Sequence, residues 1–138
     1  MIFERELDAC DARAGRDTRR ALVAYLEREA TGKTPPNGVV ETIFTELVAN
    51  VCKHGGHWAK ASVTWQDDGR PVLVVRDRGP GFDMSLWRPP SDFSESGRGL
   101  LIASALADDF SVRSEKTGKG CCIEAVLPAR RRSPSEAA

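Results

Sequence analysis

Residues 74–82 read VVRDRGPGF, an apolar segment typical of a strand that runs directly into a loop with two glycines and a proline. A carboxylate, Asp77, lies at the junction. An aspartate that ends a buried strand can simply accept hydrogen bonds from the backbone of the following turn. An Asp-x-Gly-x-Gly pattern alone is therefore weak evidence for a site, and the rest of the chain decides whether Asp77 is more than a turn residue.

The composition indicates one globular domain. A chain of 138 residues can bury a core of its own, and its 20 basic and 20 acidic side chains with few aromatics argue against a general nucleic-acid surface. We find neither a signal-peptide pattern nor an apolar run long enough to cross a bilayer, and we expect a cytoplasmic protein. The four cysteines show no C-x-x-C spacing, so we expect all of them to be reduced, with the last two on opposite faces of a strand: Cys10, Cys52, Cys121 and Cys122.

The first half of the chain predicts one strand and two helices. Residues 2–7 are consistent with an edge strand, and Asp11 is placed to cap an amphipathic helix over residues 12–29. Residues 31–38 contain two prolines and two glycines and break the helical pattern. A second helix over about residues 39–53 carries one apolar stripe and stops at Gly55 and Gly56.

The second half predicts two hairpins around a third helix. We expect strands over residues 61–66 and 72–76, the second of them central, then a long loop, a helix over 99–108 and strands over 110–116 and 121–127. Residues 129–138 resemble a disordered tail. This order predicts one domain, residues 1–128, with a two-layer α/β sandwich: a mostly antiparallel mixed sheet covered on one face by three helices.

Polar residues on the second helix form a stripe of their own. Glu46, Asn50 and His54 are spaced four apart, so their side chains stack along one face of the helix. A solvated helix face would explain three such residues, but this stripe lies beside the apolar one and should partly border the core, where a carboxylate and an amide need partners. Oxygens of this kind are the ligands that Mg²⁺ takes together with waters and phosphate.

A second glycine pattern, SGRGLLI at residues 96–102, lies where the long loop enters the third helix. Glycines there let backbone N–H groups approach a ligand, and a helix N-terminus favours phosphate. The G-x-G pattern alone is weak evidence. The chain contains neither the dinucleotide fingerprint G-x-G-x-x-G after a strand nor the P-loop pattern G-x-x-x-x-G-K-[ST], so both common nucleotide motifs are excluded.

Taken in order, three stretches resemble the N, G1 and G2 boxes of the GHKL (Bergerat-fold) ATPases: ELVANVCKH at 46–54, DRGPGFD at 77–83 and GRGL at 97–100. Within that group, the short single-domain form with an N box ending in His is similar to the bacterial anti-sigma-factor serine kinases of the RsbW and RsbT type. The resemblance covers about residues 5–128. Three boxes in the right order are far more specific than any one of them.

The resemblance implies an ATP- and Mg²⁺-dependent protein serine/threonine kinase that phosphorylates a STAS-domain anti-anti-sigma partner. Asp77 would accept a hydrogen bond from the adenine amino group, Asn50 would hold Mg²⁺, and Glu46 would be the general base for the partner's serine. Residues 83–96 would form a mobile lid over the nucleotide. The other implied nucleotide-binding residues are Lys53, His54, Gly79, Gly81, Phe82, Gly97, Arg98, Gly99 and Leu100.

The same resemblance implies a possible sigma factor as a second partner and a possible homodimer, with no direct contact to nucleic acid or membrane. Two departures from the family pattern stand out: Cys121 follows Gly120 where relatives usually carry Thr, and Leu101 occupies a position where many larger GHKL enzymes place Gly. A catalytically silent, nucleotide-gated module that sequesters a sigma factor or STAS partner remains an alternative. A detached ATPase module of a larger machine and a sensor histidine kinase have less support.

Overall fold

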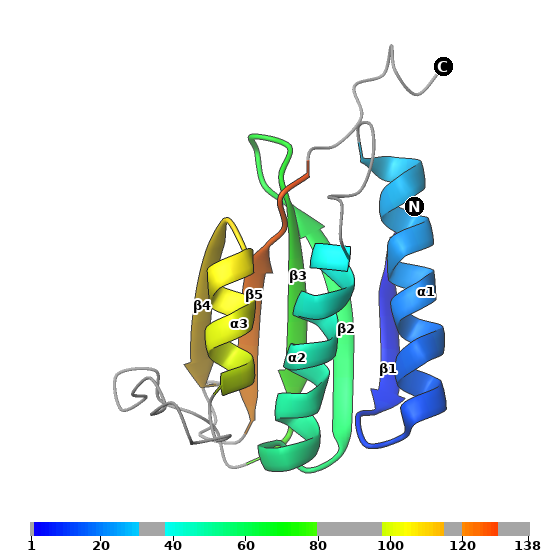
Figure 1. The fold of residues 1–138 in the computed structure, drawn as a ribbon, viewed down its shortest axis with the longest axis vertical. Helices are drawn as coiled ribbons and strands as arrows, with labels where there is room; N and C mark the ends of the chain where they lie inside the picture. The colour runs from blue at the N-terminus through cyan, green and yellow to red at the C-terminus, as the bar shows by residue number, and fades with distance from the viewer. Residues whose placement is uncertain (1, 31–37, 80–97, 115–119, 130–138) are drawn as a thin grey trace.

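The computed structural model of this chain describes residues 2–30, 38–79, 98–114 and 120–129. Within these ranges the chain forms five strands and three helices (Figure 1). In chain order they are β1 (Glu4–Asp8), α1 (Ala12–Glu29), α2 (Val39–His54), β2 (Trp58–Trp65), β3 (Pro71–Asp77), α3 (Arg98–Leu106), β4 (Asp109–Ser114) and β5 (Cys121–Val126).

The strands form one sheet in the order β1-β2-β3-β5-β4, and all four described pairings are antiparallel. The three described helices lie on the same side of this sheet, with α2 in front of the central strands (Figure 1). β3 is the middle strand, as its continuous apolar sequence predicts, and β1 lies at one edge. The two-layer α/β sandwich expected from the sequence is therefore confirmed.

The core lies between the sheet and the helices. Alternate residues of the central strands, such as Leu73 and Ile123, face it, and they pack against apolar residues of α2 such as Phe44 and Leu47. A smaller buried cluster, Val72, Val74, Cys122 and Val126, occupies the other face of β3 and β5. The neighbouring residues Cys121 and Cys122 belong to different clusters, which confirms that they point to opposite faces, and burial raises the pKa of the Cys122 thiol.

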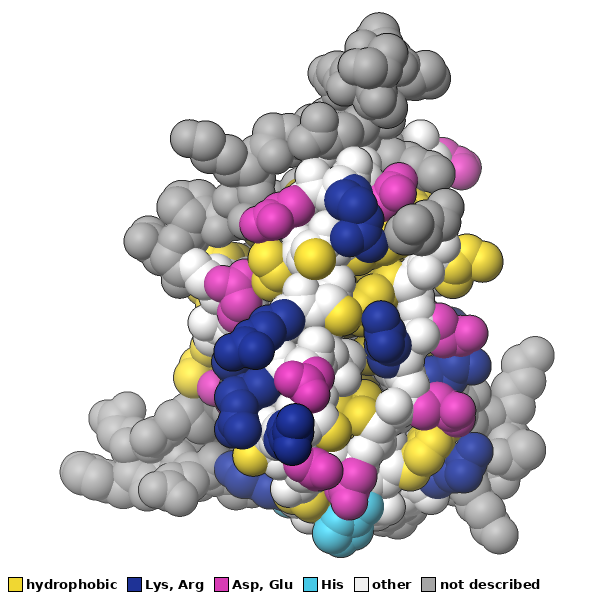
Figure 2. Space-filling view, turned by 90° about the vertical axis from the view of Figure 1, so that its right-hand side faces the viewer, with side chains coloured by type: hydrophobic (Ala, Val, Ile, Leu, Met, Phe, Trp, Pro, Cys, Tyr) yellow, Lys and Arg dark blue, Asp and Glu magenta, His cyan; other side chains and the backbone are white. Residues whose placement is uncertain are grey.

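Local signals explain where α1 begins and which way it faces. The Asp11 carboxylate accepts hydrogen bonds from the N–H groups of Arg13 and Ala14, at 3.0 and 3.2 Å, so the predicted cap is confirmed. Leu22, Leu26 and neighbouring apolar residues of the helix are buried. The outer surface on this side of the molecule carries basic and acidic side chains close together, which is the usual character of a solvated face (Figure 2).

The start of β2 differs from the sequence prediction. The strand begins at Trp58 rather than at residue 61, because Trp58 pairs with Asp8 of β1 and Ala59 pairs with Asp77 of β3. Partners on both sides extend the strand beyond the stretch that shows alternation. Long-range pairing therefore decides this boundary.

The expectation that all four cysteines are reduced is wrong for one pair. Cys10 and Cys52 form a disulfide across a sequence separation of 42, with their Cα atoms 5.0 Å apart. Pairing of β1 with β2 brings the turn after β1 next to the end of α2, an approach that cysteine spacing in the sequence does not reveal. Cys121 and Cys122 are outside any disulfide. Among the described helices, none has the length and apolar character needed to cross a membrane.

Candidate functional site

Asp77 ends β3 as a buried carboxylate, with 7% of its surface exposed. Its Oδ1 atom accepts hydrogen bonds from the backbone N–H groups of Gly79 and Cys121, each at 3.0 Å. The first is the local turn bond that the sequence allows for any such aspartate, whereas the second comes from β5, 44 residues away. Together they hold the carboxylate in one orientation at the end of the central strand.

The end of α2 packs directly against this carboxylate. A Cβ atom added at Gly55 would lie 2.6 Å from Asp77 Oδ2, and one added at Gly79 would lie 2.6 Å from the Cα of Gly55. Side chains at these two positions are therefore excluded by sterics, not by backbone conformation, since neither glycine has a positive φ. The structure thus brings together the ends of two of the stretches that carry the resemblance.

Glu46 connects the same helix to the third stretch. A Cβ atom added at Gly99 would lie 2.5 Å from Glu46 Oε2, so the half-buried carboxylate lies against the first turn of α3. Leu100, the next residue, is 2% exposed and belongs to the core, whereas Leu101 is 39% exposed. Any contact that Leu100 makes with a ligand must therefore come from its backbone.

The remaining predicted residues of α2 lie further along the helix. Asn50 is half-buried one turn after Glu46, while Lys53 and His54 are exposed in the last turn. The stripe of Glu46, Asn50 and His54 therefore runs from partly buried to solvent. Gly81, Phe82 and Gly97, the side chain of Arg98 and the predicted lid over 83–96 lie outside what the structure describes.

The sequence did not predict several of the contacts around Asp77 and the end of β3. In the sequence, Gly55 was interpreted only as the residue that ends the helix, although it also leaves room for the Asp77 side chain. A pair of glycines directly after a polar helix face is the signal that could have indicated this close packing. The Cys121 N–H bond to Asp77 does not depend on the side chain at position 121. The Arg78 guanidinium stacks on the Trp58 ring, 3.8 Å from its centroid, beside the same strand end.

Three elements therefore converge: the end of β3, the face of α2 and the start of α3, near the lower end of the view in Figure 1. They bring together the fixed, buried carboxylate of Asp77 and the carboxylate of Glu46 beside the start of α3. The amide of Asn50 lies between these two positions along α2. A carboxylate acceptor can read a ligand amino group, and oxygen ligands beside a helix N-terminus suit a hard cation and phosphate.

The chain is similar to known proteins in both sequence and fold. The family model described as the histidine kinase-like ATPase domain matches residues 9–126. The signal transduction histidine-protein kinase AfsQ2 of Streptomyces coelicolor is 28% identical over 132 residues, which cover 86% of this chain and 24% of AfsQ2. The chain thus spans about a quarter of that relative's length.

Two solved structures share the fold. A chain from the SiaB–SiaC complex of Pseudomonas aeruginosa superposes with a TM-score of 0.61 at 17% identity, covering 91% of both chains. The mycobacterial sensor histidine kinase MprB superposes with a TM-score of 0.54 at 17% identity, covering 94% of this chain and 100% of that one. At such identities the likeness concerns the fold.

Proposed function

Because this chain belongs to the histidine kinase-like ATPase domain family, we propose that it binds ATP with Mg²⁺ and phosphorylates a serine or threonine of a STAS-domain protein partner. The observation that carries the proposal is the convergence of three sequence stretches: Asp77 against Gly55, and Glu46 against Gly99. Family membership supports ATP as the nucleotide. The convergence supports a site assembled from these residues.

Asp77 reads the adenine base in this proposal. Its carboxylate is held by two backbone N–H groups, so it presents acceptor oxygens without the cost of reorganising when the ligand arrives. The exocyclic amino group of adenine is a donor, whereas guanine carries a carbonyl oxygen at the same ring position. A carboxylate in this place therefore favours ATP over GTP.

Asn50 and the start of α3 face the phosphates. The Asn50 amide oxygen is a hard ligand that fits Mg²⁺, and its place one turn after Glu46 and near the end of α2 puts it among the converging elements. When bound, Mg²⁺ neutralises charge on the phosphate oxygens. Gly99 and the Leu100 backbone contribute N–H groups at the helix start, and Lys53 supplies a positive charge in the last turn of α2.

Glu46 is the general base. Its carboxylate lies at the start of α3, next to where the phosphates approach, so it can accept the proton of a partner's hydroxyl as that oxygen attacks the γ-phosphate. The leaving group is ADP, and the phosphoryl group ends on the partner. His54 supports the end of α2 beside Gly55.

A protein substrate is supported by the fold neighbour that comes from a two-protein complex, SiaB–SiaC. The resemblance to the RsbW and RsbT kinases narrows that partner to a STAS-domain protein and adds a sigma factor as a second partner. A homodimer is also proposed on that basis alone.

The test is phosphotransfer from labelled ATP. The purified chain is incubated with Mg²⁺, γ-labelled ATP and STAS-domain proteins encoded near it, with unrelated STAS-domain proteins as the matched control. Label on a serine or threonine of a neighbouring partner supports the kinase. Nucleotide-dependent partner binding without label would replace the kinase by the silent nucleotide-gated module, and no ATP binding would overturn both.

A further inference from the structure

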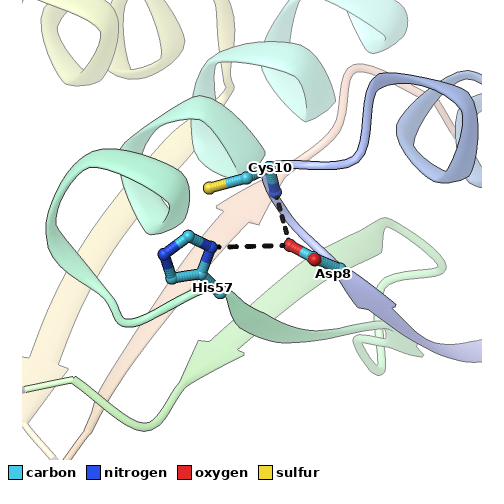
Figure 3. Close-up of side chains that lie close together, drawn as sticks. All are labelled: Asp8, Cys10 and His57. Atoms are coloured by element: carbon cyan, nitrogen blue, oxygen red, sulfur yellow. Dashed lines mark hydrogen bonds and ion pairs between the residues drawn. The ribbon is translucent and has the colours of Figure 1, made fainter.

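A corner of the molecule beside the end of α2 gathers four side chains that can bind a metal ion. Asp8 and Cys10 come from the end of β1 and the turn after it, and His57 comes from the segment between α2 and β2 (Figure 3). Cys52 lies in the last turn of α2. The backbone holds these segments together: the Ala9 N–H group donates to the carbonyl of His57 at 2.6 Å. The proximity of Asp8 and Cys10 to His57 therefore does not depend on the disulfide.

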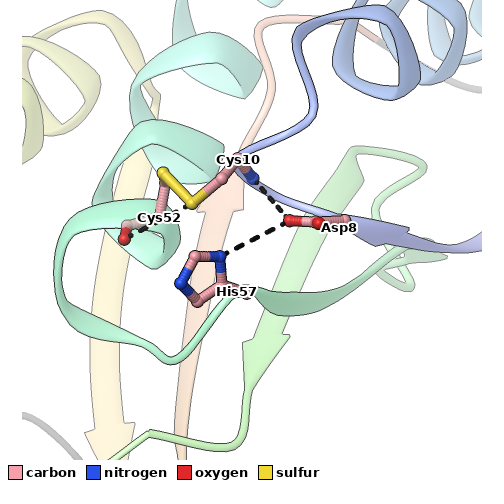
Figure 4. Close-up of a disulfide and its surroundings, with 4 residues drawn as sticks. All are labelled: Asp8, Cys10, Cys52 and His57. Carbon is pink, nitrogen blue, oxygen red and sulfur yellow. Dashed lines mark hydrogen bonds and ion pairs between the residues drawn. A yellow bond between two sulfur atoms is a disulfide. The ribbon is translucent and has the colours of Figure 1, made fainter.

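The side chains converge on one point. The Asp8 Oδ1 atom lies 3.7 Å from His57 Nδ1 and accepts the Cys10 N–H at 2.9 Å. The candidate ligand atoms of Asp8, Cys10 and His57 all lie within 4.8 Å of one another. The Cys52 sulfur is bonded to that of Cys10, and in the close-up the His57 ring lies beside both of them (Figure 4).

The backbone at His57 is unusual. Its φ of 74° makes it the one non-glycine residue with positive φ in the described ranges, and it follows Gly56 with a φ of 77°. Residues with side chains rarely adopt this conformation, and it concentrates at ligand-binding and functional sites. Here it turns the imidazole toward Asp8 and the two sulfurs.

We propose that the reduced form of this chain binds one Zn²⁺ ion through Cys10, Cys52, His57 and Asp8. Two thiolates, one imidazole and one carboxylate are four ligands of the kinds that Zn²⁺ takes in tetrahedral sites. With metal–ligand bonds of about 2.0 to 2.3 Å, the ligand atoms of a tetrahedron lie roughly 3.3 to 3.8 Å apart. The 3.7 Å between Asp8 Oδ1 and His57 Nδ1 falls in this range, and the two sulfurs move apart once their bond is reduced. Mg²⁺ and Ca²⁺ prefer oxygen ligands and do not suit a site with two sulfurs.

The disulfide and the metal exclude each other. A dithiol reductant breaks the S–S bond by supplying two electrons and two protons, which yields two thiols and an oxidised reductant. Each thiol then releases its proton when its sulfur binds Zn²⁺. Cys10, Asp8 and His57 are exposed and Cys52 is half-buried, so both the reductant and the metal can reach the site from solvent.

This inference is independent of the proposed function. Cys52 follows Asn50 by two positions, and residues two apart on a helix point about 200° away from each other. Cys52, the zinc ligand on α2, therefore points away from the Asn50 side chain. Metal binding can be measured without nucleotide or partner.

The experiment compares the oxidised and reduced chain. The protein is reduced with a dithiol, freed of reductant and metal under anaerobic conditions, and titrated with Zn²⁺ against a chromophoric chelator. Reduced wild type should bind one Zn²⁺ per chain, and the oxidised chain, which keeps the same fold, should bind none tightly. Co²⁺ in the same site should give thiolate charge-transfer bands and the visible bands of a tetrahedral centre. Zn²⁺ should also protect Cys10 and Cys52 from alkylation.

Matched variants separate this site from adventitious binding. Cys10→Ser and His57→Ala should each weaken Zn²⁺ binding by about 100-fold or more, above the usual cost of losing an outer partner of a zinc ligand. His54→Ala and Cys122→Ala remove a histidine and a thiol outside the site and should bind Zn²⁺ as wild type does. Asp8→Asn keeps the shape and should weaken binding by a smaller factor. Equal Zn²⁺ affinity in the oxidised chain or in Cys10→Ser, or no tight binding by reduced wild type, would overturn the proposal.

Discussion

Replacing Gly55 by alanine tests the close packing between α2 and the Asp77 carboxylate. The new methyl group would lie 2.6, 2.7 and 2.9 Å from Oδ2, Cγ and Cβ of Asp77. Gly55 has φ −105° and ψ 9°, which alanine can adopt, so the backbone itself does not resist the change. Because the Cβ atom of Asp77 is among the three contacts, rotation of the carboxylate alone cannot relieve the clash.

The expected loss of stability in Gly55→Ala follows from the displacement of the Asp77 side chain. Shifting Asp77 stretches its two hydrogen bonds from Gly79 and Cys121, and a bond to a charged acceptor contributes about 1.5 to 3 kcal/mol. Overpacking of a tight site costs about 1 to 3 kcal/mol. The two effects overlap, because the shift that relieves the clash is the one that stretches the bonds. We therefore expect Gly55→Ala to lower the free energy of unfolding by about 2 to 4 kcal/mol.

Urea denaturation followed by circular dichroism measures this change. An unchanged slope of the unfolding free energy against urea concentration would show that the compactness of the folded and unfolded states is preserved. Gly15→Ala is the matched control: Gly15 lies inside α1, and a Cβ there would meet no atom within 4 Å. The free energy of unfolding of Gly15→Ala should be about 0.5 to 1 kcal/mol higher than that of wild type. If Gly55→Ala stays within about 0.5 kcal/mol of wild type, the change expected for an ordinary surface site, the described packing at Asp77 is wrong.

Three further predictions concern adenine recognition, Mg²⁺ binding and the disulfide. Asp77→Asn, which exchanges an acceptor for a donor facing the adenine amino group, should weaken ATP binding by about 1 to 3 kcal/mol in calorimetry; unchanged affinity would refute that role. Asn50→Ala should impair both Mg²⁺–ATP binding and phosphotransfer, and retention of metal-dependent binding would show that Asn50 does not hold Mg²⁺. Reducing the Cys10–Cys52 bond in the presence of a chelator should lower the free energy of unfolding by about 4 kcal/mol, from the loop-closure entropy of a 42-residue separation. A loss below about 1 kcal/mol would mean that the bond does not constrain the unfolded chain as that model requires.

Local sequence signals predicted most of the fold. The periodicity over residues 12–29 and the Asp11 cap correspond to α1, because an amphipathic stripe and a capping side chain act within a few residues of each other. The apolar run at 72–76 predicted the central strand, since a strand buried on both faces cannot alternate. The order of elements then limited the fold to a layer of helices on one sheet.

The parts of the site that could be predicted were those carried by residue type and spacing. Glu46, Asn50 and Asp77 were singled out because polar groups beside an apolar stripe or at a buried strand end need partners. The structure places Glu46 beside Gly99 and Asp77 beside Gly55, so the stretches lie together. The roles of these residues in nucleotide binding and catalysis stay predictions.

What the sequence could not predict depends on contacts between distant segments. The N–H bond from Cys121 to Asp77 joins residues 44 apart, and the Cys10–Cys52 bond joins residues 42 apart. Such contacts depend on which strands pair and in what register, and a one-residue shift would move each side chain to the other face. Cysteine spacing alone therefore gave the wrong expectation for Cys10 and Cys52.

Single-turnover phosphotransfer by the Glu46→Gln variant tests the central claim most directly. The glutamine keeps the size of the side chain beside Gly99 but cannot accept the proton of the attacking hydroxyl. With Mg²⁺–ATP bound as tightly as in wild type, transfer to the STAS-domain partner should slow by roughly 100-fold or more, the usual scale for a lost general base. Transfer at the wild-type rate by a folded, ATP-bound Glu46→Gln protein would contradict the assignment of Glu46 as the base, and with it the catalytic site proposed for this chain.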